Sequence, residues 1–138
     1  MEKNSIRIMY SGDRQIAAMR HFFPKCAYKK NGEQIVFYVR LKVHEKIPEY
    51  KVKLIYQGNI PPKVYVVYPE IIENAKHTYS DKSLCLYHYS NFKWTSSKLV
   101  ANEIMRWTAA WIYFYEYWLQ TGKWIAKEVP HTNKFTKE

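Results

Sequence analysis

Cys85 is the residue of this sequence best suited to covalent chemistry. It lies in the segment 83–87 (SLCLY), within a stretch that shows little periodicity. A cysteine reacts as its thiolate, and neighbouring positive charge favours that form. His77 lies eight residues upstream, His88 lies three residues downstream, and Lys82 adds a cation. We therefore treat Cys85 as the candidate nucleophile.

The same region admits other chemistries. A protease-like pair would need a histidine held by an Asn or Asp, for which Asn91 is close in sequence. Zinc binding through His77, Cys85 and His88 is conceivable, although their spacing matches no standard site. The second cysteine, Cys26, is a much weaker candidate for catalysis. Either thiol could instead be buried and inert.

The composition is that of a single globular domain with free thiols. The 138 residues are 47% hydrophobic and 17% aromatic, so we expect one domain over residues 1–138. Two cysteines cannot form a disulfide framework. The N-terminus lacks the apolar run of a signal peptide, and the most apolar stretch, 107–119, is too short to span a membrane. We therefore expect a cytoplasmic protein with no membrane association.

The positive charge is concentrated in the first part of the chain. The net charge is +10, and residues 1–60 contain 12 Lys and Arg against 5 Asp and Glu. Such a basic face could attract nucleic acid, acidic lipid or an acidic protein. Charge alone specifies no ligand, so we expect a solvated face or a protein partner rather than nucleic acid.

The first half of the sequence predicts a helix followed by an antiparallel meander. Apolar residues at helical spacing indicate a helix from about Asp13 to Phe23, which Pro24 ends. Asn31-Gly32 and Gly58-Asn59 are turn signals. The predicted strands cover about 26–29, 34–43, 50–56 and 63–67, with 61–62 (PP) ahead of the fourth strand and Pro69 behind it.

The second half predicts a long loop and then helices. Residues 69–94 form a loop of about 25 residues, and ordered loops of that length are usually functional. Ser96 or Ser97 could cap the next helix, and Gly122 could end it. Four aromatic residues at i, i+4, i+7 and i+11 indicate a core-facing stripe: Trp107, Trp111, Phe114 and Trp118. The order of elements is that of an α+β domain.

Several motifs together resemble ubiquitin-conjugating enzymes. The sequence contains, in order, 61–66 (PPKVYV), 77–79 (HTY), 84–87 (LCLY) and Trp94. That family has a Pro-rich strand entry, a His-Pro-Asn tripeptide, an Ile/Leu-Cys-Leu active site and a downstream Trp. The aromatic tail up to His131 is similar to bacterial ubiquitin-conjugating-like proteins of the antiphage operons called CBASS. The resemblance covers roughly residues 15–131.

The resemblance implies a fold and a reaction. The fold would be the ubiquitin-conjugating one, with an N-terminal helix, a four-stranded antiparallel meander, a long active-site loop and C-terminal helices. Cys85 would form a thioester with the C-terminal tail of a cGAS/DncV-like nucleotidyltransferase, and a lysine-bearing protein would be a possible acceptor. No cofactor or metal is implied. The chain has no room for an adenylating domain, so it resembles the stand-alone form.

Two departures from the family motif concern the residues around the cysteine. Thr78 stands where the family has Pro, and Tyr79 stands where it has the Asn associated with oxyanion stabilisation. A Tyr hydroxyl can donate a hydrogen bond, so Tyr79 could serve a similar role or could be a packing residue. His77 is, with Tyr79, a catalytic candidate for positioning and oxyanion stabilisation at Cys85, and it would support the loop rather than act as a base. The alternatives to an enzyme are a non-catalytic module that binds the cyclase and a basic nucleic-acid-binding domain.

Overall fold

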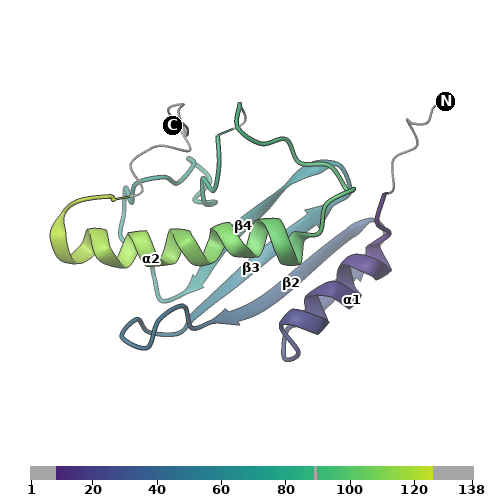
Figure 1. Ribbon diagram of the computed structural model, residues 1–138, viewed down its shortest axis with the longest axis horizontal. Coiled ribbons are helices and arrows are strands. Elements are labelled where there is room, and N and C mark those ends of the chain that lie inside the picture. The colour runs from purple at the N-terminus through teal and green to yellow at the C-terminus, as the bar shows by residue number, and fades with distance from the viewer. Residues whose placement is uncertain (1–8, 89, 126–138) are drawn as a thin grey trace.

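The structure, a computed structural model, describes residues 9–88 and 90–125, which form an α+β domain (Figure 1). A helix is followed by four strands, a long irregular segment, a π-helical turn and a second α-helix. The elements are α1 (Gly12–Phe22), β1 (Ala27–Asn31), β2 (Gln34–Leu41), β3 (Tyr50–Gln57), β4 (Ile60–Tyr68), η1 (Val100–Ile104) and α2 (Met105–Thr121). The helix–meander–loop–helix order predicted from sequence is confirmed.

The four strands form one antiparallel sheet in the order β1-β2-β3-β4. Gly32 and Gly58 occupy the two tight turns with φ of +65° and +57°, a backbone region that glycine adopts without steric cost. Strand β4 begins earlier than predicted, because Pro61 and Pro62 lie inside it rather than ahead of it. An edge strand tolerates proline, since an N–H on its open side has no ladder partner to lose.

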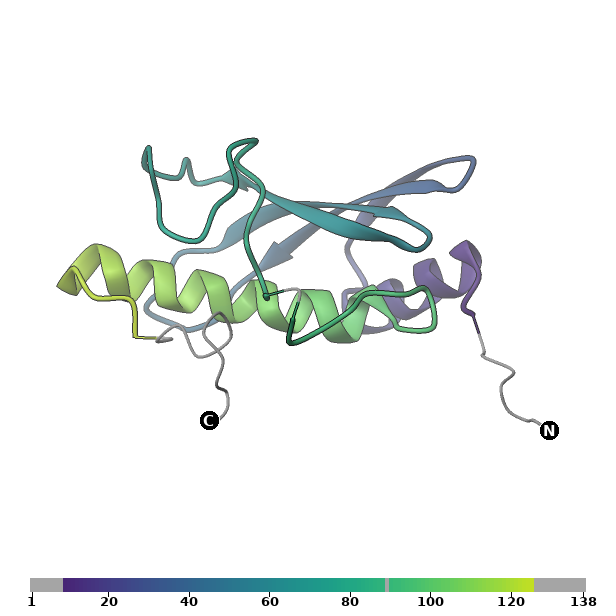
Figure 2. The ribbon, with the colours of Figure 1, turned by 90° about the horizontal axis from the view of Figure 1, so that it is seen from above.

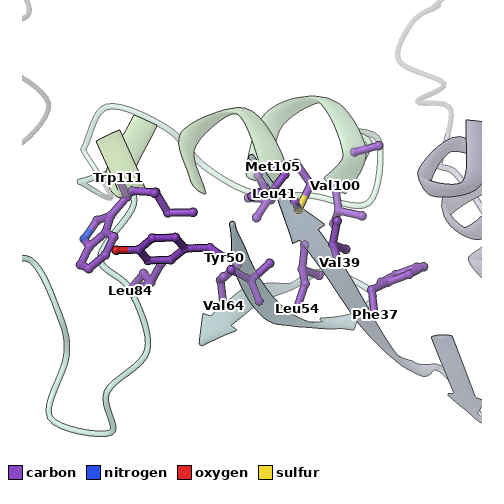
Figure 3. Close-up of a cluster of buried hydrophobic side chains, with 14 of the residues drawn as sticks. Phe37, Val39, Leu41, Tyr50, Leu54, Val64, Leu84, Val100, Met105 and Trp111 are labelled. Carbon is purple, nitrogen blue, oxygen red and sulfur yellow. The ribbon is translucent and has the colours of Figure 1, made fainter. Parts of the chain in front are cut away.

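Both helices cover one face of the sheet (Figures 1 and 2). The inward-facing residues alternate along β2 and β3. They are Ile35, Phe37, Val39, Leu41, Tyr50, Val52, Leu54 and Tyr56. Figure 3 shows the Tyr50 ring pointing toward Trp111, and its hydroxyl donates a hydrogen bond to the Glu116 carboxylate. The buried phenol therefore keeps a polar partner.

The start of the C-terminal helical segment is fixed by a residue from α1. Gln15, fully buried, donates through Nε2 to the Lys98 carbonyl at 2.8 Å and accepts through Oε1 from the Val100 amide at 3.0 Å. The prediction that Ser96 or Ser97 caps this helix is wrong. The helical segment begins at Val100, and a side chain distant in sequence satisfies its first amide.

The aromatic stripe of α2 is only partly buried. Trp111 is 3% exposed, whereas Trp107, Phe114 and Trp118 are half-buried. The buried face of α2 instead runs through Met105, Thr108, Trp111, Ile112 and Tyr115. Gly122 ends the helix with φ +80°, as predicted. Among residues 9–88 and 90–125, α2 is the only α-helix after the loop, where several were expected. In the same residues, no helix is long and apolar enough to cross a membrane.

Candidate functional site

Cys85 is held by a short antiparallel contact within the long loop. Thr78 and Leu84 form an isolated bridge. On one side of it the Cys85 amide donates to the His77 carbonyl at 2.8 Å, and on the other the Tyr79 amide donates to the Ser83 carbonyl at 2.8 Å. The loop thus folds back on itself at the positions that the sequence singled out.

The same contact is joined to the sheet through Leu84. The Leu84 amide donates to the Val64 carbonyl of β4 at 2.9 Å, and the Leu84 side chain, 4% exposed, enters the core beside Tyr50 and Trp111 (Figure 3). Ser83 is buried as well, at 2% exposed, so burial ends at Leu84 along this segment. The Cys85 side chain is half-buried.

Cys85 lies on an open groove of about 700 Å³ between β4 and the loop. The start of β4, with Pro61, Pro62 and Lys63, forms one wall, and loop residues from Tyr79 to His88 form the other. A groove of this size can hold a peptide segment. The thiol is therefore accessible to a ligand lying along the groove.

The Tyr79 side chain lies next to the Cys85 thiol. Burial, followed by a hydrogen bond with Cys85 and the charge of that group, raises the pKa of Tyr79 above its ordinary value. The phenol therefore stays protonated at neutral pH and remains a hydrogen-bond donor. The ring is 55% exposed, so it is not a core residue.

His77 contacts this site through its backbone. Its carbonyl accepts hydrogen bonds from the Cys85 amide at 2.8 Å and from the Trp111 indole at 3.0 Å. The residue has φ +58°, a left-handed conformation uncommon for histidine. Its imidazole packs against Trp124, with 4.7 Å between ring centroids. The carbonyl thus joins the backbone of Cys85 to α2.

Asp81 holds the turn between Tyr79 and Cys85, and sequence reasoning missed it. Its carboxylate accepts hydrogen bonds from Lys63 Nζ at 2.6 Å and Tyr65 Oη at 3.2 Å, and from the amide and hydroxyl of Ser83 at 2.9 and 2.6 Å. The Lys63 hydrogen bond is the main reason that the pKa of Asp81 lies below its usual range. The segment 80–83 (SDKS), whose Asp caps the amide two residues on, was the available signal.

An aromatic cluster lies on the downstream side of Cys85. The rings of Tyr87, Phe92 and Trp107 are in mutual contact, with centroids 4.6 to 5.0 Å apart. The Cys85 sulfur lies 3.9 Å from the Tyr87 carbonyl oxygen. Burial, and next the Cys85 charge, raises the pKa of Tyr87. Within the half-buried part of the stripe, Trp107 therefore packs on the loop, whereas Phe114 and Trp118 pack against Trp124.

The remaining candidates from the sequence are His88, a zinc site and Cys26. The His88 ring is 2.6 Å from the Ser90 hydroxyl. Within the described part of the chain, no three His, Cys, Asp or Glu side chains gather closely enough to hold a metal ion. Cys26 is half-buried just before β1, and burial raises the pKa of its thiol. Raising that pKa disfavours the reactive thiolate of Cys26.

These features define an α+β domain with an accessible cysteine on a loop-walled groove. The family model for the Type II CBASS E2 protein matches residues 15–132, and the chain therefore belongs to this family of CBASS-associated, E2-like proteins. The match covers almost the same residues as the resemblance seen in the sequence. No curated protein matches the chain.

Proposed function

We propose that the protein is a ubiquitin-conjugating-like transferase that carries the C-terminal acyl group of another protein as a thioester on Cys85. The observation that carries the proposal is the placement of Cys85 on an open groove with the protonated Tyr79 phenol beside its thiol. Membership of the Type II CBASS E2 family supports the same reaction. The overall fold is of the ubiquitin-conjugating kind in this proposal.

The reaction has two acyl transfers. In the first, the Cys85 thiolate attacks the carbonyl carbon of an activated C-terminus, a thioester or acyl adenylate supplied by another protein. The new S–C bond forms as the donor's thiolate or AMP leaves. In the second, a neutral amine attacks the Cys85 thioester, a C–N bond forms, the C–S bond breaks, and the amine's proton passes to solvent. Positioning and oxyanion stabilisation account for most of the catalysis in such transfers.

The residues around Cys85 take different roles in this scheme. Tyr79 is the candidate donor to the tetrahedral oxyanion, because its hydroxyl is protonated and close to the sulfur. His77 is a positioning residue that acts through its carbonyl. The groove walls, including Pro61 and Leu86, would receive the extended tail of the donor protein.

The donor in this proposal is the C-terminal tail of the cGAS/DncV-like nucleotidyltransferase of a CBASS operon. Family membership indicates a partner from such an operon. The acceptor is a lysine amine, and the setting is antiphage defence in the bacterial cytoplasm.

The test uses a synthetic peptide with the last residues of that cyclase, made as a C-terminal thioester. Intact-mass spectrometry should show one acyl adduct on the wild type, which dithiothreitol removes. Cys85→Ala should give no adduct, while the matched variant Cys26→Ala should react like the wild type. Equal labelling of the wild type and Cys85→Ala would contradict the proposal. Tight binding of the peptide without any adduct would identify a non-catalytic module instead.

A further inference from the structure

The outer face of the sheet, which is covered by none of the helices in the described residues, is strongly basic. None of the residues in β1, β2, β3 and β4 is Asp or Glu. Strand register places five cations on the outer face, opposite to the buried positions: Lys29, Arg40, Lys51, Lys53 and Lys63. Asp81 pairs with Lys63. In the described part of the chain, no acidic side chain makes an ion pair with any of the other four.

Two exposed tyrosines, Tyr38 and Tyr68, and the half-buried Tyr65 lie between these cations. The register gives one row across the strands with Tyr38, Lys53 and Tyr65, and a second with Arg40, Lys51 and Tyr68. Lys51 Nζ lies 6.0 Å from the Tyr38 ring centroid, and Lys53 Nζ lies 5.9 Å from that of Tyr65. Tyr38 and Tyr68 are 37% and 67% exposed. The face therefore presents aromatic rings and cations side by side.

One pair on this face opposes stability. Arg40 and Lys51 are direct partners on adjacent strands. Like charges in that position destabilise a sheet, whereas opposite charges stabilise it. Stability alone therefore does not account for this pair, but an anionic ligand lying across both side chains would offset their repulsion.

We propose that this basic outer face (Lys29, Tyr38, Arg40, Lys51, Lys53, Tyr65 and Tyr68) binds single-stranded nucleic acid. Lysine and arginine neutralise phosphates, and tyrosine rings on an open sheet stack with bases. Protein interfaces are instead depleted in lysine and have an apolar centre. On this face, the only apolar outward residues of the two central strands, β2 and β3, are Val36 and Ile55, and both are half-buried. From net charge alone, a protein partner was expected rather than nucleic acid. The tyrosine rings and the like-charged Arg40–Lys51 pair are the additional observations that favour nucleic acid.

The test measures binding of the full chain to a fluorescein-labelled, mixed-sequence 12-nucleotide DNA single strand by fluorescence anisotropy. With four cations that have no acidic partner among residues 9–88 and 90–125, the slope of log affinity against log salt should be about −3. Affinity should then fall roughly 50-fold between 50 and 200 mM KCl. Absence of binding at 50 mM KCl would overturn the proposal.

Variants separate a built site from general attraction to a basic protein. Lys51→Glu should weaken binding by about tenfold or more, since it removes a phosphate contact and adds repulsion. It should also raise the Tm by about 1–3 °C, because it places opposite charges across from each other. Arg20→Glu, with the same change in net charge on α1, should alter affinity less than twofold. Equal weakening by both variants would overturn the proposal.

A further variant separates nucleic acid from an acidic protein. Tyr38→Thr keeps a strand-forming residue but removes the ring, and should weaken binding about tenfold through lost stacking. A 12-residue poly-glutamate peptide should compete poorly with the oligonucleotide. If Tyr38→Thr binds normally and poly-glutamate competes equally, the face binds an acidic protein segment and the proposal fails.

Discussion

The sheet is ordered by repetition, whereas the loop that bears Cys85 is ordered by a few individual contacts. Along β2 and β3 every second side chain is buried, and the backbone ladder pairs each strand with its neighbour. Between β4 and η1, the described residues make one isolated bridge, Thr78 with Leu84. Single hydrogen bonds supply the rest, from the backbone, such as the Leu84 amide donating to the Val64 carbonyl at 2.9 Å, and from side chains, such as the Trp94 indole donating to the Gly58 carbonyl at 2.8 Å.

The sheet should therefore mainly determine the stability of the fold, and the loop should mainly determine the position of the groups next to Cys85. Removing one core side chain from the sheet affects all of the packing around it, because protein cores are close-packed. Removing one contact from the loop changes the position of a few groups next to Cys85. Variants of the sheet should therefore act on the free energy of unfolding, and variants of the loop should act on the reaction.

The largest change in stability is expected in the sheet. Leu54→Ala removes a fully buried side chain and should lower the free energy of unfolding by about 2–5 kcal/mol. Urea denaturation followed by circular dichroism measures this change. Val67→Ala, at a 46% exposed position of β4, should cost less than about 1 kcal/mol. Equal losses in the free energy of unfolding for the two variants would contradict a core on the helix-covered face of the sheet.

The loop variant Tyr79→Phe should slow the proposed reaction and leave the stability almost unchanged. It keeps the ring but removes the proposed oxyanion donor, so transfer from the Cys85 thioester to a lysine amine should slow about 10²-fold. The free energy of unfolding should change by less than about 0.5 kcal/mol. Single-turnover kinetics measure the rate, with Tyr113→Phe on α2 as the control. A normal rate would identify Tyr79 as a packing residue.

Gln15 joins the two regions and should give an intermediate effect. Gln15→Leu leaves the Lys98 carbonyl and the Val100 amide without their buried partner, so we expect a loss of about 1–3 kcal/mol. Thermal denaturation measures the loss, and Arg20→Ala on the exposed side of α1 is the control. A loss no larger than that of Arg20→Ala would show that the start of the helical segment does not depend on Gln15.

The smallest effect should come from Asp81 and should depend on pH. The pKa of Asp81 is lowered in the folded protein, so its stabilising effect is complete above the unfolded value of about 3.9 and is lost as pH falls through the lower folded value. The difference in Tm between the wild type and Asp81→Asn should be constant from about pH 5 to 8 and shrink below about pH 4. Asp13→Asn is the charge-matched control. A difference that grows on acidification would contradict the Lys63–Asp81 contact.

The sequence predicted the repetitive part of the molecule well. The predicted strand ranges overlap all four observed strands, and the glycine turns at Gly32 and Gly58 are where the turn signals lie. Low periodicity located the long loop. These features depend on neighbours in the sequence, so local patterns are sufficient to find them.

The sequence did not predict the contacts that depend on distant residues. The side chain of Gln15, which belongs to α1, accepts a hydrogen bond from the first amide of the second helical segment. The predicted local caps, Ser96 and Ser97, were therefore wrong. Trp107, the first residue of the aromatic stripe, packs on Tyr87 and Phe92 of the loop, a contact that periodicity cannot distinguish from packing on the sheet. Asp81 depends on Lys63, 18 residues away. The motif singled out the candidate site around Cys85, whereas the contacts that support the loop required the tertiary structure.

The shared carbonyl of His77 has a consequence for the order of folding. One oxygen accepts from both the Cys85 amide and the Trp111 indole, and the indole lies 34 residues further along the chain. The native surroundings of Cys85 are therefore complete only after α2 has docked on the sheet. A chain still emerging from the ribosome would contain the cysteine but not the Trp111 contact behind it, so the proposed acyl transfer would become possible last, once α2 has docked.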